Sequence, residues 1–194
     1  MQVNDTNETA VRIIQVADKL FFTYGYSRVS VDEIAAELGM SKKTIYKHFS
    51  SKEALLKAAI DAFDEELQAG TATIFALDNI PFNEKMDRFI QFMGSNMGKI
   101  NSPQMINIRR TAPNVWRHIE LLRRRNIQDK FGALLAEGVQ QGHIRKDVNV
   151  ELVQLMILGA LEKLIPSEQA INLPLTGVEI LQMTTQIILN GILK

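Results

Sequence analysis

Three lysines and two hydroxyl side chains lie within six consecutive positions of the chain: Lys42, Lys43, Thr44, Tyr46 and Lys47. In a helix, a rotation of about 100° per residue puts Lys43 and Lys47 on one outer face, between the two hydroxyl groups. No acidic residue shares this face. Ammonium and hydroxyl groups bind phosphate oxygens, and near the amino end of a helix they also reach base edges in a major groove. The pattern therefore indicates binding to double-stranded DNA.

The residues around this face predict a helix-turn-helix. Ser30 and Glu33 have the spacing of a capping box, and Gly39 suits the left-handed residue that ends a helix. Ser41 can then cap the second helix, and Ile45, with Phe four positions later, predicts its buried stripe. The alternative is a solvated face on an ordinary helical hairpin. The common register of caps, glycine and buried stripe favours the DNA-reading helix.

These residues resemble the amino-terminal domain of the TetR/AcrR family of bacterial transcription regulators. The specific part is the Tyr-x-His-Phe series that starts at Tyr46, followed by Ser-Lys-Glu ending at Glu53, and the likeness extends over about residues 10 to 60. The resemblance implies phosphate contacts from Thr44, Tyr46 and Lys52. It also implies base or phosphate contacts from Lys42, Lys43 and Lys47. The candidate DNA-binding residues are Ser41, Lys42, Lys43, Thr44, Tyr46, Lys47, His48 and Lys52.

Composition restricts the kind of DNA binding that is possible. The 194 residues are 46% hydrophobic, enough for a real core, and their formal net charge is zero. DNA affinity must therefore come from local charge, which residues 41–57 supply with five lysines and one glutamate. The chain has no cysteine, which excludes disulfides and thiolate chemistry, and no apolar stretch reaches the ~20 residues of a membrane span. We expect a cytoplasmic protein with no membrane segment.

Helical periodicity recurs along nearly the whole chain, without strand alternation. The predicted fold is all-α, with a three-helix helix-turn-helix DNA-binding head at residues 1–60 and a larger helical ligand-binding and dimerisation body at residues 61–194. Ser50 and Glu53 predict a second capping box, at the start of the helix that links head and body. Further helices are expected over residues 83–97, 103–110, 113–141, 150–165 and 177–193.

The last two predicted helices are apolar on more than one face. A helix of this kind is buried on both sides, either in the centre of a larger bundle or between two protomers. We favour a two-fold four-helix homodimer interface, in which Gly159 and Ala160 allow close approach. The candidate interface residues are Leu155, Leu158, Gly159, Leu161, Leu181 and Ile188. A homodimer would present two reading helices to a near-palindromic operator.

The middle of the predicted body is rich in Phe, Met and Arg. Resemblance to the family implies a pocket for a small-molecule effector among these segments, whereas the residues alone also fit plain core. The candidate pocket residues are Phe89, Phe92, Met93, Met97, Met105, Ile108, Arg109 and Trp116. Nothing in them defines the chemistry of the effector.

Two other classes of function are an enzyme and a protein-binding adaptor. The three histidines, His48, His118 and His143, have no metal-ligand spacing, and the chain has no glycine-rich phosphate loop and no serine elbow. We therefore expect no catalytic residue, no metal and no cofactor. An adaptor that binds protein through its head remains an alternative, because a helix-turn-helix does not guarantee DNA binding. The prediction is a dimeric, sequence-specific transcription regulator, a repressor released by a small-molecule ligand.

Overall fold

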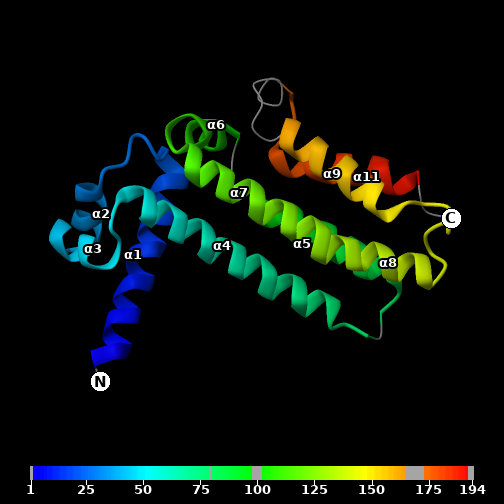
Figure 1. The fold of residues 1–194 in the computed structure, drawn as a ribbon, viewed down its shortest axis with the longest axis horizontal. Coiled ribbons are helices and arrows are strands. Elements are labelled where there is room, and N and C mark those ends of the chain that lie inside the picture. The colour runs from blue at the N-terminus through cyan, green and yellow to red at the C-terminus, as the bar shows by residue number, and fades with distance from the viewer. Residues whose placement is uncertain (1, 79, 98–101, 165–172, 192–194) are drawn as a thin grey trace. The chain divides into compact units, whose positions relative to one another are not determined.

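A computed structural model describes residues 2–78, 80–97, 102–164 and 173–191. Within these ranges the chain is helical and has no β-strand, which confirms the predicted all-α fold (Figure 1). The predicted ends of the last two helices, Ile165 and Leu193, lie outside the described residues. The helices are α1 (Gln2–Tyr24), α2 (Val31–Leu38), α3 (Lys42–His48), α4 (Lys52–Phe75), α5 (Phe82–Met97), α6 (Ser102–Thr111), α7 (Pro113–Asn126), the π-helical turn η1 (Ile127–Phe131), α8 (Gly132–Gln140), α9 (Val150–Leu164) and α11 (Gly177–Asn190).

The chain forms two compact units, each built from two segments. Unit 1 contains Met1–Glu65 and Gln104–Ile119, and unit 2 contains Glu66–Pro103 and Glu120–Lys194. The predicted domain boundary at residue 60 stays a prediction, because compactness alone does not define a domain that folds by itself. The assignment of most of α6 and the first half of α7 to unit 1 has no counterpart in the sequence prediction.

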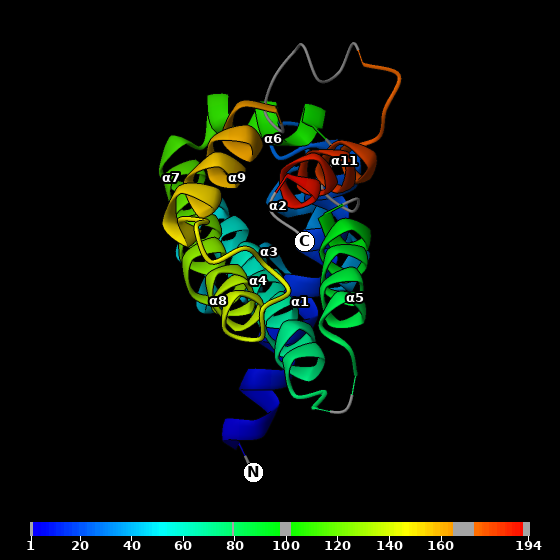
Figure 2. The same cartoon turned by 90° about the vertical axis from the view of Figure 1, so that its right-hand side faces the viewer.

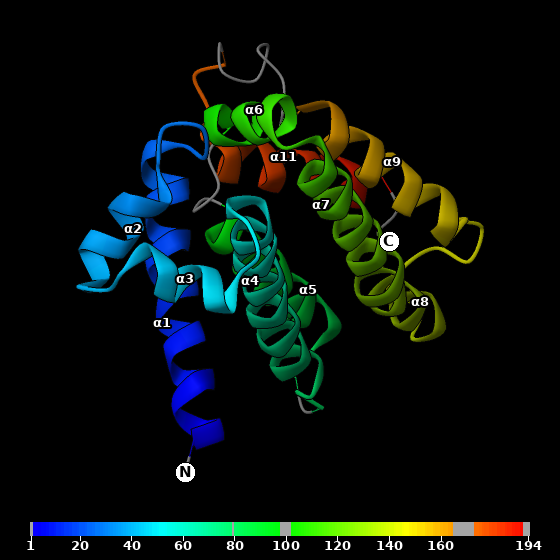
Figure 3. The same ribbon diagram turned by 60° about the vertical axis from the view of Figure 1, so that its left-hand side comes forward.

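In unit 1, α1 packs against α2, and α2 packs against α3 (Figure 3). Ile13, Ala17 and Phe21 recur on one face of α1 and are completely buried. Ile34 of α2 and Ile45 of α3 are buried as well. These buried side chains form one small core, which fixes the side of α3 that remains outside.

The α6 segment of unit 1 supports the turn between α1 and α2. The side-chain amide of Asn107 donates to Ser27 Oγ at 2.8 Å, and its oxygen accepts the backbone N–H of Ser27 at 3.1 Å. Gly25, in the same turn, has a φ of +96°, which favours glycine, and a Cβ there would lie 2.8 Å from Gln104 Oε1. Met105 and Ile108 are buried on the other side of α6.

Unit 2 has an apolar core formed by α5, η1, α8, α9 and α11. Phe89 of α5 stacks on Phe131 with ring centroids 5.8 Å apart, and Leu158 of α9 and Leu189 of α11 belong to the same buried cluster. Helix α11 packs against both α5 and α9, and the last two lie on either side of it (Figure 2).

The single helix predicted over residues 113–141 is wrong in one respect, because a π-helical turn, Ile127–Phe131, separates α7 from α8. A wider turn leaves backbone carbonyls without their usual partner. Gln154 of α9 supplies a donor in its place, since its Nε2 donates to the carbonyls of Gln128 at 2.8 Å and Ile127 at 3.3 Å. A Cβ on Gly132 would lie 1.8 Å from the same Nε2, so the approach requires glycine there.

The predicted capping box at Ser50 and Glu53 is also wrong by one residue. Helix α4 begins at Lys52, and its cap is Ser51, whose Oγ accepts the N–H of Ala54 at 3.0 Å. Two adjacent serines offer the same hydroxyl, and only the backbone path decides which of them accepts the bond. At the start of α11, Thr176 and Glu179 form a complete capping box.

Candidate nucleic-acid interface

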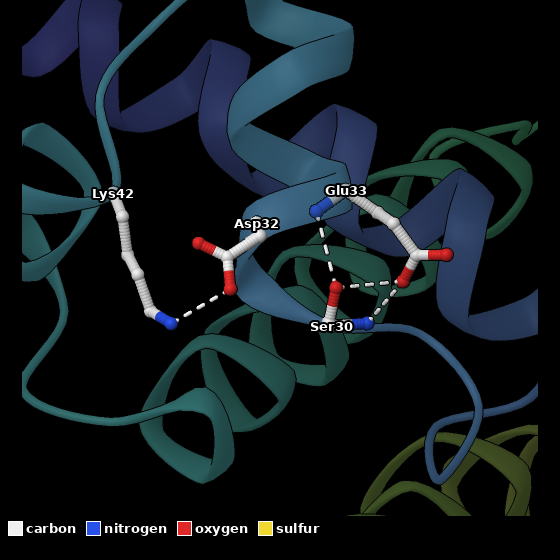
Figure 4. Close-up of polar contacts among 4 residues, drawn as sticks. All are labelled: Ser30, Asp32, Glu33 and Lys42. Carbon is white, nitrogen blue, oxygen red and sulfur yellow. Dashed lines mark hydrogen bonds and ion pairs between the residues drawn. The ribbon is translucent and has the colours of Figure 1, made fainter.

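The first half of the motif is fixed by the capping box at the start of α2. Ser30 Oγ accepts the N–H of Glu33 at 3.2 Å, and Glu33 Oε2 accepts the N–H of Ser30 at 2.6 Å (Figure 4). The hydrogen bonds from the Ser30 backbone and hydroxyl lower the pKa of Glu33. At the other end, Gly39 has a φ of +63°, and the next N–H, of Met40, returns to the carbonyl of Ala35 at 2.9 Å.

The amino end of α3 is fixed by Ser41. Its Oγ accepts the N–H of Thr44 at 3.1 Å and lies 2.9 Å from the Thr44 hydroxyl. Ile45 is 1% exposed, so the opposite side of this seven-residue helix faces outward. Tyr46 and Lys47 lie on the exposed side, as the helical periodicity predicts.

The lysines of α3 differ in their surroundings. Within the part of the chain that the structure describes, no carboxylate oxygen lies within 4.0 Å of the ammonium groups of Lys43 and Lys47. Lys42 Nζ, in contrast, lies 2.7 Å from Asp32 Oδ2 of α2, and this hydrogen bond raises the pKa of Lys42 (Figure 4). The predicted cationic face is therefore present, with one of its three charges compensated inside the protein.

Lys52, at the start of α4, is placed differently from the other candidates. Its ammonium group lies 4.3 Å from the centroid of the Tyr26 ring and 5.9 Å from that of Phe21. Burial lowers the pKa of Lys52, and the charge of Glu33 opposes this effect. The sequence does not predict this cation–π contact, because Tyr26 lies in the turn before the motif and far from Lys52 in the sequence. The predicted phosphate contact of Lys52 remains a prediction.

His48 ends α3 and is half-buried, with its ring centroid 6.4 Å from that of Phe49. This position allows both packing and contact with a ligand on the outside of the helix. The structure thus brings together the candidates of α3 on one side of unit 1. Sequence reasoning missed Asp32, although an acid at the start of the first helix and a lysine at the start of the second were visible signals.

The candidate pocket residues divide between the two units. Phe89, Phe92 and Met93 belong to unit 2, where Phe89 is part of the buried core and Phe92 lies against Gly70, whose Cβ would be 2.1 Å from the ring. The other four described candidates, Met105, Ile108, Arg109 and Trp116, belong to unit 1, and the side chain of Met97 lies outside the described residues. The pocket stays a prediction.

The candidate interface residues divide by burial. Leu155 is 53% exposed, and Gly159 has no atom within 4 Å of an added Cβ. Leu158 and Leu161 are each 5% exposed and pack in the core of unit 2. Ile188 packs partly against the same core, and the side chain of Leu181 lies outside the described residues. A contact with a second copy through Leu158 and Leu161 would need the core to open.

A hydrogen bond between Asp61 and His118 joins α4 and α7 within unit 1. Asp61 contacts both His118 Nε2 and, at 2.8 Å, Lys57 Nζ. Burial opposes the charge on Asp61, but the hydrogen bonds from Lys57 and His118 outweigh it and lower the pKa of this carboxyl. The hydrogen bond to His118 holds α7 beside α4, the helix that follows the helix-turn-helix.

The residues that the structure describes form neither a metal site nor a helix that could span a membrane. No group of three or more His, Asp or Glu side chains there has the geometry to hold a metal ion. No helix in those ranges is long and apolar enough to cross a membrane.

The capped pair of helices has a cationic outer face, and the other regular elements among the described residues are helices too, which together define a helix-turn-helix DNA-binding regulator. The family model for bacterial regulatory proteins of the tetR family matches residues 13–59. An uncharacterized HTH-type transcriptional regulator of Bacillus subtilis, YvaF, is 25% identical over 184 residues, which are 93% of this chain and 94% of that protein.

Two further comparisons agree, one in fold and sequence and the other in sequence alone. The structure of PfmR, a TetR family transcriptional regulator from Thermus thermophilus, is 28% identical with a TM-score of 0.64, covering 92% of this chain and 97% of that one. The DNA-binding transcriptional repressor TetR of Mycobacteroides abscessus is 44% identical over 52 residues, 27% of either chain. These comparisons confirm the resemblance to the TetR family of bacterial regulators and the predicted function as a DNA-binding regulator.

Proposed function

We propose that this regulator binds a near-palindromic operator as a homodimer, with α3 of each protomer in a major groove, and that a small-molecule effector releases it. The observation that carries the DNA contact is the exposed face of α3. Lys43 and Lys47 have no carboxylate nearby among the described residues, so their charges are available to phosphates. Ser41, Thr44, Tyr46 and His48 add donors around them, and Lys42 lies at the amino end, where base edges are within reach.

A second copy of the chain is the partner that fits the outer face of the last two helices. Leu152, Leu155 and Met156 of α9 are more than half exposed, and Gly159 continues the same stripe one turn further on. Helix α11, which packs beside α9, exposes Ile187 to 71%. Contiguous exposed apolar surface of this kind is unusual in a protein that stays monomeric. We therefore assign the interface to these side chains together with Met183, and no longer to Leu158 and Leu161.

Two-fold assembly explains how a short reading helix obtains a specific site. Each α3 covers only a few base pairs, and two of them must lie about 34 to 36 Å apart to read half-sites one helical turn from each other. We also infer that the protein acts in the bacterial cytoplasm, where it would bind its operator. The proposed release follows if the effector favours a conformer with another separation, and by linkage DNA then weakens effector binding by the same factor, typically on the order of 5 to 150.

The decisive test of the function is selection of bound fragments from the source genome, followed by titration of the purified protein with the selected site at several salt concentrations. The proposal requires a near-palindromic site and an affinity that falls steeply with salt. Protein that selects no fragment, but that captures a protein partner through its head, would support the adaptor alternative.

The effector pocket is tested in unit 2 with Phe92→Ala. Phe92 is only half-buried, so its loss should change the response to an effector and leave operator binding by the ligand-free protein nearly intact. Phe89→Ala is the matched control, because Phe89 is core and its loss should destabilise unit 2 by about 3 to 5 kcal/mol. Equal damage from both substitutions would mean that Phe92 is core as well.

A further inference from the structure

Asp32 and Lys42 form an ion pair between the starts of the two motif helices. Lys42 Nζ donates to Asp32 Oδ2 at 2.7 Å, although the two residues are ten positions apart (Figure 4). Both side chains remain accessible, with 48% of Lys42 and 66% of Asp32 exposed. The pair therefore lies where an incoming phosphate or base edge can reach it.

Both partners are attached to helix ends that are already fixed. The capping box between Ser30 and Glu33 holds the first turn of α2, and it uses the carboxylate of Glu33. Asp32 is then the acid of this turn that faces α3 (Figure 4). On the other side, the cap formed by Ser41 holds the first turn of α3, which contains Lys42. The short distance follows from two rigid turns and needs little ordering of the chain.

The pair changes what Lys42 contributes to DNA binding. Lys43 and Lys47 can release counterions from any duplex, since no carboxylate approaches them in the described ranges. Lys42 must first leave Asp32, and a carboxylate then remains close to the phosphates. In a loose complex with DNA of arbitrary sequence nothing compensates for this loss. In a complex with α3 fully seated in the groove, a hydrogen bond from Lys42 to a base edge or a fixed phosphate replaces the internal one.

We propose that Asp32 is a specificity-determining residue, which holds Lys42 and thereby lowers the affinity for DNA of arbitrary sequence more than the affinity for the operator. This inference rests on the proposed role of the α3 face in DNA binding. It assigns to an acidic side chain a function that a survey of cationic residues alone does not reveal.

The experiment measures binding of the full-length protein to a mixed-sequence duplex and to the best site selected from the genome, between about 0.05 and 0.2 M salt. The variants are Asp32→Asn, Lys42→Ala and the double substitution. Glu37→Gln is the matched control, because Glu37 is an exposed carboxylate of the same helix that pairs with Lys19 at 3.4 Å, away from α3. It changes the net charge by the same amount.

Asp32→Asn should bind the mixed-sequence duplex about eightfold more tightly per head at 0.1 M salt, with a log–log salt slope steeper by about 0.9, because one more lysine contacts phosphate. The gain on the selected site should be smaller. Glu37→Gln should change neither value, and Asp32→Asn should add little in the Lys42→Ala background. Circular dichroism of each variant checks that α2 remains folded.

Three results would overturn the inference. An equal gain with Glu37→Gln would assign the effect to net charge, and an undiminished gain in the Lys42→Ala background would assign it to Asp32 alone. No gain at all would show that Lys42 is as available in the wild type as in the variant. Failure of the proposed function looks different, since the wild type would then bind neither duplex in a salt-dependent way.

Discussion

Helices α3 and α9 both expose one face and bury the other, but the exposed faces differ in chemistry. Helix α3 exposes lysines and Tyr46 and buries Ile45. Helix α9 exposes Leu155 and Met156 and buries Leu158. A cationic face is well hydrated in water and attracts a polyanion through its charge. An apolar face, in contrast, is stabilised by any surface that removes it from water. The first face thus suits a reversible contact with DNA, and the second suits a lasting contact with another copy.

The two helices are also held in place by different forces. A helix of seven residues, as α3 is, is unstable in isolation and depends on its caps and on a single buried side chain. Helix α9 has fifteen residues and is held by four buried apolar side chains, Val153, Ile157, Leu158 and Leu161. Substitutions should therefore distinguish the contribution of hydrogen bonds to the stability of α3 from the contribution of packing to the stability of α9.

The largest effect is expected when a charged side chain is introduced into α9, either on its buried side or on its exposed side. Leu158→Glu places a carboxylate in the core of unit 2, which should unfold that unit, because an uncompensated buried charge costs several kcal/mol. Leu155→Glu places the same charge on the exposed stripe, where the helical content should persist and the dimer should dissociate. Thermal denaturation and sedimentation velocity measure the two outcomes. A wild type that sediments as a monomer at micromolar concentration would contradict the interface.

The next effect concerns the lysine face of α3. If Lys47 contacts one phosphate in each head of a dimer, as proposed, Lys47→Ala should lower the log–log salt slope of operator binding by about 1.8, and the affinity by roughly one to two orders of magnitude at 0.1 M salt. Lys19→Ala is the control, an exposed lysine of α1 that pairs with Glu37. If both variants bind with the wild-type slope, Lys47 does not contact the DNA.

A smaller effect is expected at the two glycines with positive φ and open space around them, Gly39 with +63° in unit 1 and Gly142 with +80° in unit 2. Alanine at either position meets no atom but adopts a left-handed conformation, which costs about 1 to 2 kcal/mol. Both variants should lose similar stability in urea. Only Gly39→Ala should also weaken DNA binding, because this turn orients α3. Equal DNA affinity of the two variants would show that the turn tolerates strain without moving the helix.

The smallest effect is expected at Asp61 and depends on pH. The pKa of Asp61 is lowered in the folded protein, so its contribution is complete above the unfolded value near 4 and is lost as the pH falls through the folded pKa. Asp61→Asn should destabilise unit 1 by at most about 0.5 to 1 kcal/mol at pH 7, because water screens a carboxylate that is 39% exposed, and by progressively less below about pH 4. Urea unfolding from pH 7 to pH 3 measures the difference. A loss that does not change over this range would assign the effect to packing.

The amino-acid sequence by itself determined the helices, the turn of the motif and most of the caps. Ser30 with Glu33, and Gly39 after them, act through backbone groups at most a few residues away, so their pattern is sufficient. The outward direction of Lys43 and Lys47 follows from helical rotation once Ile45 is buried.

Relations between distant segments required the folded chain. Leu155 and Leu158 are both leucines in a helix that is apolar all round, and only its neighbours decide which of them is core. The pairing of Lys42 with Asp32 and the π-helical turn beside Gln154 likewise depend on contacts between helices. Local hydrogen bonds can be read from the order of residues, whereas packing is defined by the surfaces that meet, and these exist only after the chain has folded.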